Sequence, residues 1–169
     1  MTRRFAAAAC LAILVAGCQT DNQPRPPAPV DRVDHIDLFT SHTALNLDGA
    51  PGPDGTRAEL FLYQRQKPQT QMIRGTVDFL LYEHEGQTDP DSLQRLLQRK
   101  PDYQWSFGEP QLARRRFMRM GLWGYWFVLD WGSNQPDTSR VVLLVRYTPA
   151  GADGRVLYSA PAIITVKAD

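Results

Sequence analysis

The sequence predicts a mainly β fold, an antiparallel sandwich of the immunoglobulin-like or transthyretin-like type with one short helix. Turn-forming pairs recur along the chain, among them Asp48-Gly49, Asp54-Gly55, Glu85-Gly86 and Asp153-Gly154. The runs between these turns are short and rich in β-branched and aromatic residues, as is typical of strands. Such spacing favours two packed antiparallel sheets over strands that alternate with long helices.

The predicted strands cover most of the chain after residue 32. We expect them at 33–39, 57–64, 74–83, 103–107, 113–119, 121–131, 140–147 and 156–166. In 74–83, Val77, Phe79 and Leu81 alternate with polar residues, which indicates one buried face at that end. The run Val141-Val142-Leu143-Leu144-Val145 is apolar on both faces, which indicates a central strand.

The strand at 121–131 is unusually aromatic. Because side chains alternate between the two faces of a strand, one face carries Trp123, Tyr125, Phe127, Leu129 and Trp131, and must lie in the core. The other face carries Trp126 between the smaller Gly124 and Val128. We expect Trp126 to be buried under a loop or helix, or in a second core. The alternative is an exposed ring that forms a partner-binding patch with Arg114 and Arg116, since Trp and Arg are enriched at binding hot spots.

One helix is predicted near 90–99. Asp89 suits the N-cap, Pro90 suits the first turn, and Pro101 ends the helix. Three leucines, Leu93, Leu96 and Leu97, form an apolar stripe. We expect this stripe to close the side or the end of the sandwich, and a partner-binding helix is the alternative.

The first 17 residues have the layout of an export signal. Arg3 and Arg4 precede an apolar run from residue 5 to about residue 15, which is too short for an ordinary membrane span. The stretch Leu14-Val15-Ala16-Gly17-Cys18 resembles the lipobox of bacterial lipoproteins. This resemblance implies cleavage after Gly17, a diacylglyceryl group on Cys18 and acylation of the new amino terminus. The alternative is an ordinary secretory signal in which Cys18 is incidental.

The lipobox resemblance places the protein in the cell envelope, with the membrane as a partner through the lipid on Cys18. Gln19 stands where an aspartate would retain such a lipoprotein in the inner membrane, so we expect the outer membrane and a domain that faces the periplasm. The chain has two cysteines, and Cys10 lies in the segment that would be removed. The mature domain therefore has no partner with which Cys18 could form an internal disulfide.

Residues 18–32 are predicted to form a proline-rich linker between the lipid and a domain at 33–169. Pro24, Pro26, Pro27 and Pro29 favour an extended stalk, and a tail packed on the domain is the alternative. Removal of residues 1–17 changes the net charge from +1 to −1, because it removes two arginines and no acidic residue. A chain of this charge has no general attraction for nucleic acid.

The sequence contains no pattern that predicts catalysis, a metal site or a cofactor. The histidines, His35, His42 and His84, are scattered, and an enzyme would need two of them, or the carboxylates, to converge. Glu83, Glu85, Asp89 and Asp91 cluster in one polar connection, where they more simply face water and the positive end of the helix dipole. The loop at 46–57 fails the EF-hand pattern, because Ala50 and Arg57 stand at ligand positions.

The sequence therefore favours a non-catalytic structural or protein-docking lipoprotein, with a glycan- or peptide-binding module of the envelope as the alternative. The residues from Leu45-Asn46 to Phe79-Leu80-Leu81-Tyr82-Glu83 are similar to part of the small outer-membrane lipoprotein of type VI secretion. That resemblance implies a transthyretin-like sandwich that docks to a larger membrane subunit. The tryptophan-rich second half departs from the pattern of that family.

Overall fold

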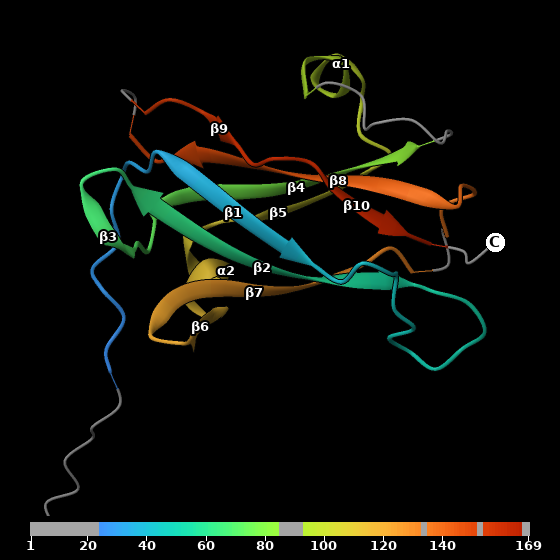
Figure 1. Ribbon diagram of the computed structural model, residues 1–169, viewed down its shortest axis with the longest axis horizontal. Helices are drawn as coiled ribbons and strands as arrows, with labels where there is room; N and C mark the ends of the chain where they lie inside the picture. Colours follow the sequence, from blue (N-terminus) through green and yellow to red (C-terminus); the bar gives the residue numbers. More distant parts are fainter. Residues whose placement is uncertain (1–23, 85–92, 133–134, 152–153, 167–169) are drawn as a thin grey trace, which may run out of the picture.

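A computed structural model describes residues 24–84, 93–132, 135–151 and 154–166. The described strands form two antiparallel sheets packed face to face, which confirms the predicted β-sandwich (Figure 1). The first sheet contains β1 (His35–Thr40), β2 (Gly55–Gln64), β3 (Lys67–Thr70), β6 (Arg116–Arg119) and β7 (Leu122–Asp130). The second contains β4 (Gly75–His84), β5 (Tyr103–Phe107), β8 (Arg140–Pro149), β9 (Leu157–Tyr158) and β10 (Ala162–Thr165).

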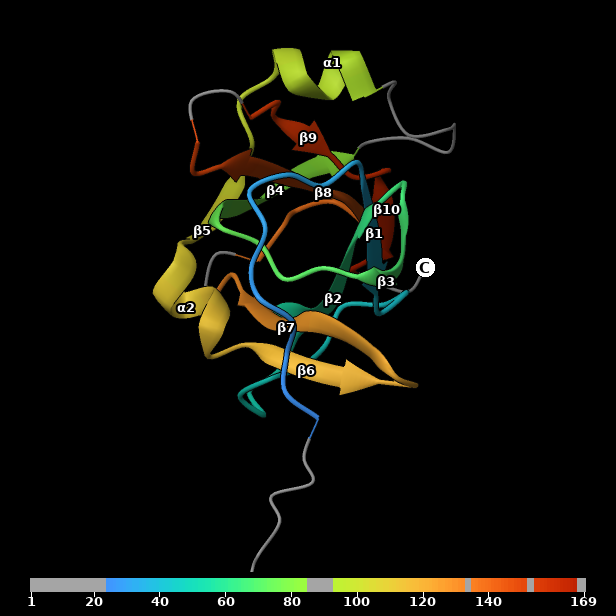
Figure 2. The same ribbon diagram turned by 90° about the vertical axis from the view of Figure 1, so that its left-hand side faces the viewer.

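Strand order makes β2 and β7 central in one sheet and β8 and β4 central in the other. The first sheet runs β1-β2-β7-β6, with β3 paired to β2, and the second runs β10-β8-β4-β5, with β9 paired to β8. The longest ladder joins β4 to β8, in agreement with the predicted central place of the Val141–Val145 run. Figures 1 and 2 show β6 and β7 at the bottom of the molecule and the helix α1 at the top.

The main core lies between the two sheets, and alternate side chains of each strand point into it. Tyr125, Phe127 and Leu129 of β7 are fully buried, as predicted for this face. The ring of Phe127 lies 4.6 Å from that of Phe79 in β4 and 4.8 Å from that of Phe107 in β5. These ring contacts connect the two sheets, and aromatic pairs of this kind add about 0.5–1.5 kcal/mol to the free energy gained by burial.

Helix α1 (Leu93–Gln98) covers the outer face of the second sheet, above β4 and β8 in Figure 1. Leu96 is 1% exposed and packs in a second cluster with Leu80, Tyr82, Val142 and Leu144. The predicted stripe thus covers one side of the sandwich, the outer face of the second sheet, and does not cover its end. Strands β4 and β8 are apolar on both faces, so a helix on their outer face buries apolar surface that would otherwise be exposed to water. Leu97 is 38% exposed, and the predicted cap residues Asp89 and Pro90 lie outside the described residues.

Two predicted strands need correction, and one strand was not predicted. A second helix, α2 (Glu109–Ala113), takes the start of the strand expected at 113–119, because Pro110 favours a first helical turn and the Gln111 side chain accepts a hydrogen bond from the Gly108 amide. The strand expected at 156–166 is divided into β9 and β10 by an irregular segment that contains Pro161. The polar strand β3 was not predicted, since it is a short edge strand with one buried residue.

The predicted linker is in part a component of the domain. Val30 forms a parallel bridge with Ile73, in which its amide donates to the Met72 carbonyl at 2.8 Å and its carbonyl accepts from the Arg74 amide at 2.9 Å. Val33 is buried in the core. The alternative of a tail packed on the domain therefore holds for residues 30–32, and the domain begins before residue 33. The apolar Val30 and Val33 stabilise the segment against the sheet despite the nearby prolines.

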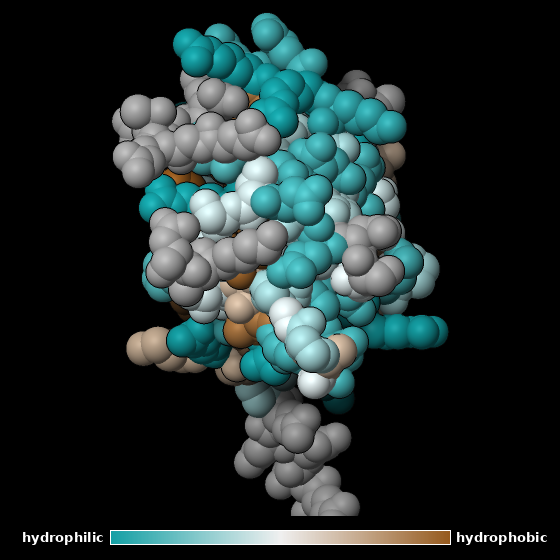
Figure 3. All heavy atoms as spheres, turned by 90° about the vertical axis from the view of Figure 1, so that its right-hand side faces the viewer, coloured by the Kyte–Doolittle hydropathy of each residue, from teal (hydrophilic) through white to brown (hydrophobic). Residues whose placement is uncertain are grey.

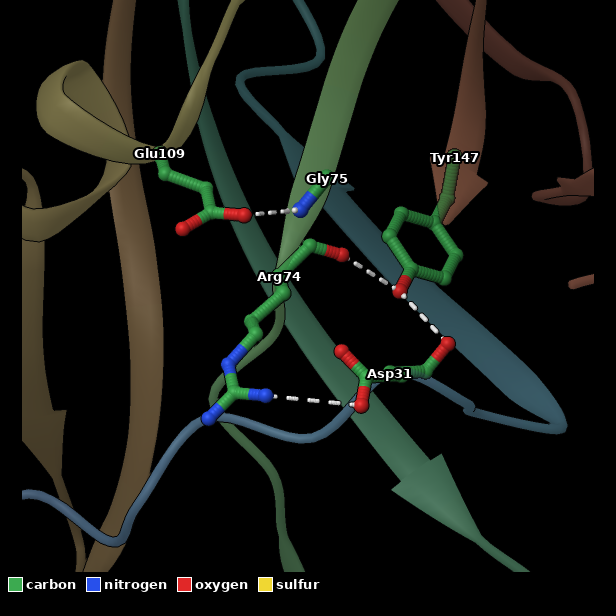
Figure 4. A network of polar contacts seen from close by, with 5 residues as sticks. All are labelled: Asp31, Arg74, Gly75, Glu109 and Tyr147. Carbon is green, nitrogen blue, oxygen red and sulfur yellow. Dashed lines mark hydrogen bonds and ion pairs between the residues drawn. The ribbon is translucent and has the colours of Figure 1, made fainter. Parts of the chain in front are cut away.

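A network of polar contacts holds the segment around residue 31 against β8 and the residues before β4 (Figure 4). The Tyr147 hydroxyl shares its one proton between the Arg74 carbonyl at 2.8 Å and the Asp31 carbonyl at 3.3 Å. Arg74 pairs with the Asp31 carboxylate at 3.5 Å. The Gly75 amide donates to Glu109 of α2 at 3.2 Å. Burial, helped by the negative charge of Asp31, raises the pKa of Tyr147 to about 12. Tyr147 therefore remains a hydrogen-bond donor at any physiological pH.

Candidate functional site: an aromatic patch on the first sheet

The three histidines of the chain do not converge in the fold. His35 pairs with Asp37 of the same strand at 2.6 Å, His42 follows the opposite end of β1, and His84 ends β4 in the other sheet. Within the described ranges, no three His, Cys, Asp or Glu side chains are grouped as metal ligands. Glu85, Asp89 and Asp91 lie outside these ranges. The histidines therefore lie at separate places in the two sheets and do not share one site.

Asp54 organises the loop at 46–57, which does not match the EF-hand pattern. Its carboxylate accepts hydrogen bonds from the Leu47 amide at 2.6 Å and the Asp48 amide at 3.1 Å. Desolvation acts to raise the pKa of Asp54, but these hydrogen bonds outweigh it and hold the pKa below its usual value. The oxygens of Asp54 therefore stabilise the turn by accepting backbone hydrogen bonds.

The outer face of the first sheet carries an aromatic patch. Register places Phe39 of β1 opposite Glu59 of β2, and Glu59 opposite Trp126 of β7, so the three side chains share one face. On the same face, β6 contributes Phe117 opposite Gly124 and Arg119 opposite Leu122. We define the aromatic patch as six side chains: Phe39, Phe61, Phe117, Met120, Leu122 and Trp126.

Phe61 is the centre of the patch. It is 5% exposed, its ring lies 5.8 Å from that of Phe39, edge to face, and 5.6 Å from that of Phe117. Gly124 makes this arrangement possible, because a Cβ there would lie 2.9 Å from the Phe61 ring and 3.0 Å from the Phe117 ring. Gly124, which precedes Trp126 on this face of β7, thus leaves room for two phenylalanines.

The rim of the patch is exposed to solvent. Phe39 is 55% exposed, Trp126 is 41% exposed and Met120 is 94% exposed. Two grooves of about 260 and 250 Å³ adjoin these side chains, and the Glu59–Arg119 ion pair, 2.6 Å long, lines both. Large apolar side chains that are grouped in this way on a protein surface are typical of interaction sites.

The expectation that Trp126 is buried was therefore wrong. The covering helix α1 lies on the second sheet, so it leaves this face of the first sheet open. One polar groove beside Trp126 is lined by Phe39, Thr40, Ser41, Arg57, Glu59 and Arg119.

The structure does not bring the predicted trio of Arg114, Arg116 and Trp126 together on one face. Arg116 lies opposite Tyr125, whose side chain points into the core, so Arg116 is on the other side of the sheet from Trp126. Arg114 is the C-cap of α2. A binding role for these three residues remains a prediction.

The arginines that do line the Trp126 groove are Arg57 of β2 and Arg119 of β6, which the sequence analysis missed. Neither is close to Trp126 in sequence. The available signal was the alternation of Arg57 and Glu59 with the core residues Ala58 and Leu60, which places both charged side chains on the outer face.

A tight hairpin holds Met120 at the edge of the patch. Met120 has φ 50° and Gly121 has φ 80°, the pair of positive values expected at the centre of a type I′ turn. Methionine seldom adopts positive φ. The turn between β6 and β7 therefore projects an apolar side chain into solvent.

Comparisons with protein-family models, with curated proteins and with solved structures find no match for this chain. The resemblance to bacterial lipoproteins, and to the lipoprotein of type VI secretion, therefore remains a prediction from the sequence.

In the described part of the chain, no helix is both long enough and apolar enough to span a membrane. The end of the sandwich away from the N-terminal segment is largely hydrophilic in its described residues (Figure 3).

Proposed function

We propose that this protein is a lipid-anchored component of the bacterial cell envelope with a non-catalytic, structural or docking role. Cys18 is the proposed attachment point, and the outer membrane, with the domain in the periplasm, is the proposed location. The observation that carries the docking role is the aromatic patch, where Phe39, Met120 and Trp126 are exposed on one face. Burial of such side chains yields about 25 cal/mol per Å² of apolar surface, so a contact there is favourable.

Two experiments test this proposal. Cys18→Ser should abolish lipid labelling and processing of the chain, and unchanged labelling would exclude the anchor. A photo-crosslinking residue in place of Met120 should capture an envelope component in intact cells. The same residue in place of Leu97, an exposed side chain on α1, is the matched control and should capture less. Equal capture at the two positions would exclude a docking role for the patch.

A glycan- or peptide-binding module is the second proposal, and one observation favours it. Phe39 and Trp126 are both exposed and line one groove with the polar Arg57 and Glu59. Aromatic rings beside hydrogen-bonding side chains are suited to a sugar ring or an extended peptide. Binding of cell-wall fragments to the folded domain, lost in Trp126→Ala, would support this function over the first.

A further inference from the structure

The fold determines where the N-terminal segment leaves the domain. The bridge between Val30 and Ile73 fixes residue 30 at one end of the sandwich (Figure 1). The hydrogen bond from Tyr147 to the Asp31 carbonyl holds the next residue (Figure 4). From there, going toward the N-terminus, the blue segment descends along that end of the molecule, and its first described residues lie lower than β6, beyond the end of the sandwich (Figures 1 and 2). Helix α1 lies on the opposite side of the molecule.

The distance from this exit point to the lipid is limited by covalent geometry. If Cys18 carries the lipid, as the proposed function holds, Pro24 lies six residues after the acylated position. An extended chain of that length spans at most roughly 20 Å. Residue 24 therefore stays near the bilayer, and so does the side of the domain on which it lies.

The side chains on that side are those that favour a bilayer surface. Tryptophan and other aromatic residues are enriched where hydrocarbon meets the lipid headgroups. The aromatic patch offers Trp126 and Phe39, and the hairpin adds Met120. Arg57 lies among them, and arginine can bury its aliphatic stem while its guanidinium contacts phosphate. Arg119, on the same face, is paired with Glu59 at 2.6 Å.

We infer that the aromatic patch rests on the surface of the bilayer that holds the anchor, with Phe39, Met120 and Trp126 in the headgroup region. This inference rests on the proposed lipid anchor and names the partner of the patch as phospholipid. The patch would act as a second membrane contact beside the acyl chains. It would orient the domain so that the second sheet and α1 point away from the membrane.

The test uses the mature lipoprotein in vesicles of phosphatidylethanolamine and phosphatidylglycerol. Because Cys18 is the one cysteine after residue 17 and would be acylated, Met120→Cys introduces a unique free thiol for an environment-sensitive fluorophore. Leu97→Cys on α1 is the matched control at an exposed apolar residue. We expect a blue shift and several-fold stronger quenching by nitroxide-labelled lipids at position 120 than at position 97. Replacing Phe39 and Trp126 with serine should weaken the quenching at position 120.

Each other outcome overturns the inference in an identifiable way. Flotation with the vesicles but equal quenching at the two positions would refute membrane contact while leaving the anchor intact. A probe at position 120 that is exposed on vesicles but shielded in native membranes would assign the patch to a protein partner. Failure of the intact chain to float with vesicles would overturn the anchor, and with it this inference.

Discussion

Replacing Tyr147 with phenylalanine removes one hydroxyl while keeping the buried ring. The hydroxyl donates its one proton mainly to the Arg74 carbonyl, at 2.8 Å, and shares it with the more distant Asp31 carbonyl, at 3.3 Å. A hydrogen bond of this kind contributes about 0.5–1.5 kcal/mol net. Asp31 and Arg74 are exposed residues, so water can replace the lost donor in part. We therefore expect Tyr147→Phe to lower the free energy of unfolding by about 1–2 kcal/mol.

The same substitution should change how stability depends on pH. An unfolded tyrosine ionises near pH 10. The folded Tyr147 has a pKa of about 12, so its contribution is fully present below pH 10 and is lost as the pH rises toward 12. In the wild-type protein this loss should amount to roughly 1–3 kcal/mol. The difference in stability between the wild type and Tyr147→Phe should therefore shrink between pH 10 and pH 12.

Urea unfolding at pH 8 and pH 11 measures both effects, and amide hydrogen exchange locates them. The amides of Val30 and Arg74, which bond across the segment, should exchange faster in Tyr147→Phe. Tyr82 is a buried tyrosine in the cluster beneath α1. Tyr82→Phe is therefore the control, and it should leave the amides of Val30 and Arg74 protected. Unchanged stability together with unchanged exchange at Val30 and Arg74 would refute the view that Tyr147 fastens the N-terminal segment.

Other substitutions separate the core from the patch. Gly124→Ala should destabilise the fold by about 1–3 kcal/mol, since its Cβ would meet the Leu60 carbonyl oxygen and the Phe61 ring at 2.9 Å; unchanged urea midpoints would argue against this close packing. Phe127→Ala should cost about 3–5 kcal/mol and Trp126→Ala clearly less, and equal losses in thermal unfolding would mean that Trp126 is buried. Leu96→Ala should cost about 2–5 kcal/mol, and a smaller loss accompanied by loss of a partner would make α1 an interface.

The core could be predicted because alternation along a strand is a local property. The odd-numbered residues of β7, from Tyr125 to Leu129, are buried as the sequence indicates, and the β8 run is central. The helix near residue 93 was also predictable, because its leucines repeat at helical spacing. These elements can be predicted without knowing which strands are neighbours in a sheet.

The predictions that failed depend on non-local packing. Burial of Trp126 was decided by the side of the sandwich on which α1 docks, which the leucine stripe does not specify. Arg57 and Arg119 lie beside Trp126 through pairing among β2, β7 and β6, a register that no single strand reveals. The prolines of the linker indicated a stalk, whereas Val30 and Val33 contact the domain.

The attachment of residue 30 has a mechanical consequence for a tethered domain. A pull on the N-terminus would be taken first by the two backbone hydrogen bonds between Val30 and the segment 72–74, before it reached the ladder of β1 with β2. Tyr147 anchors the same short stretch to β8. Force applied at the N-terminus would thus enter the sandwich through the segment that precedes β4, so the terminal strand β1 is protected from separating from β2.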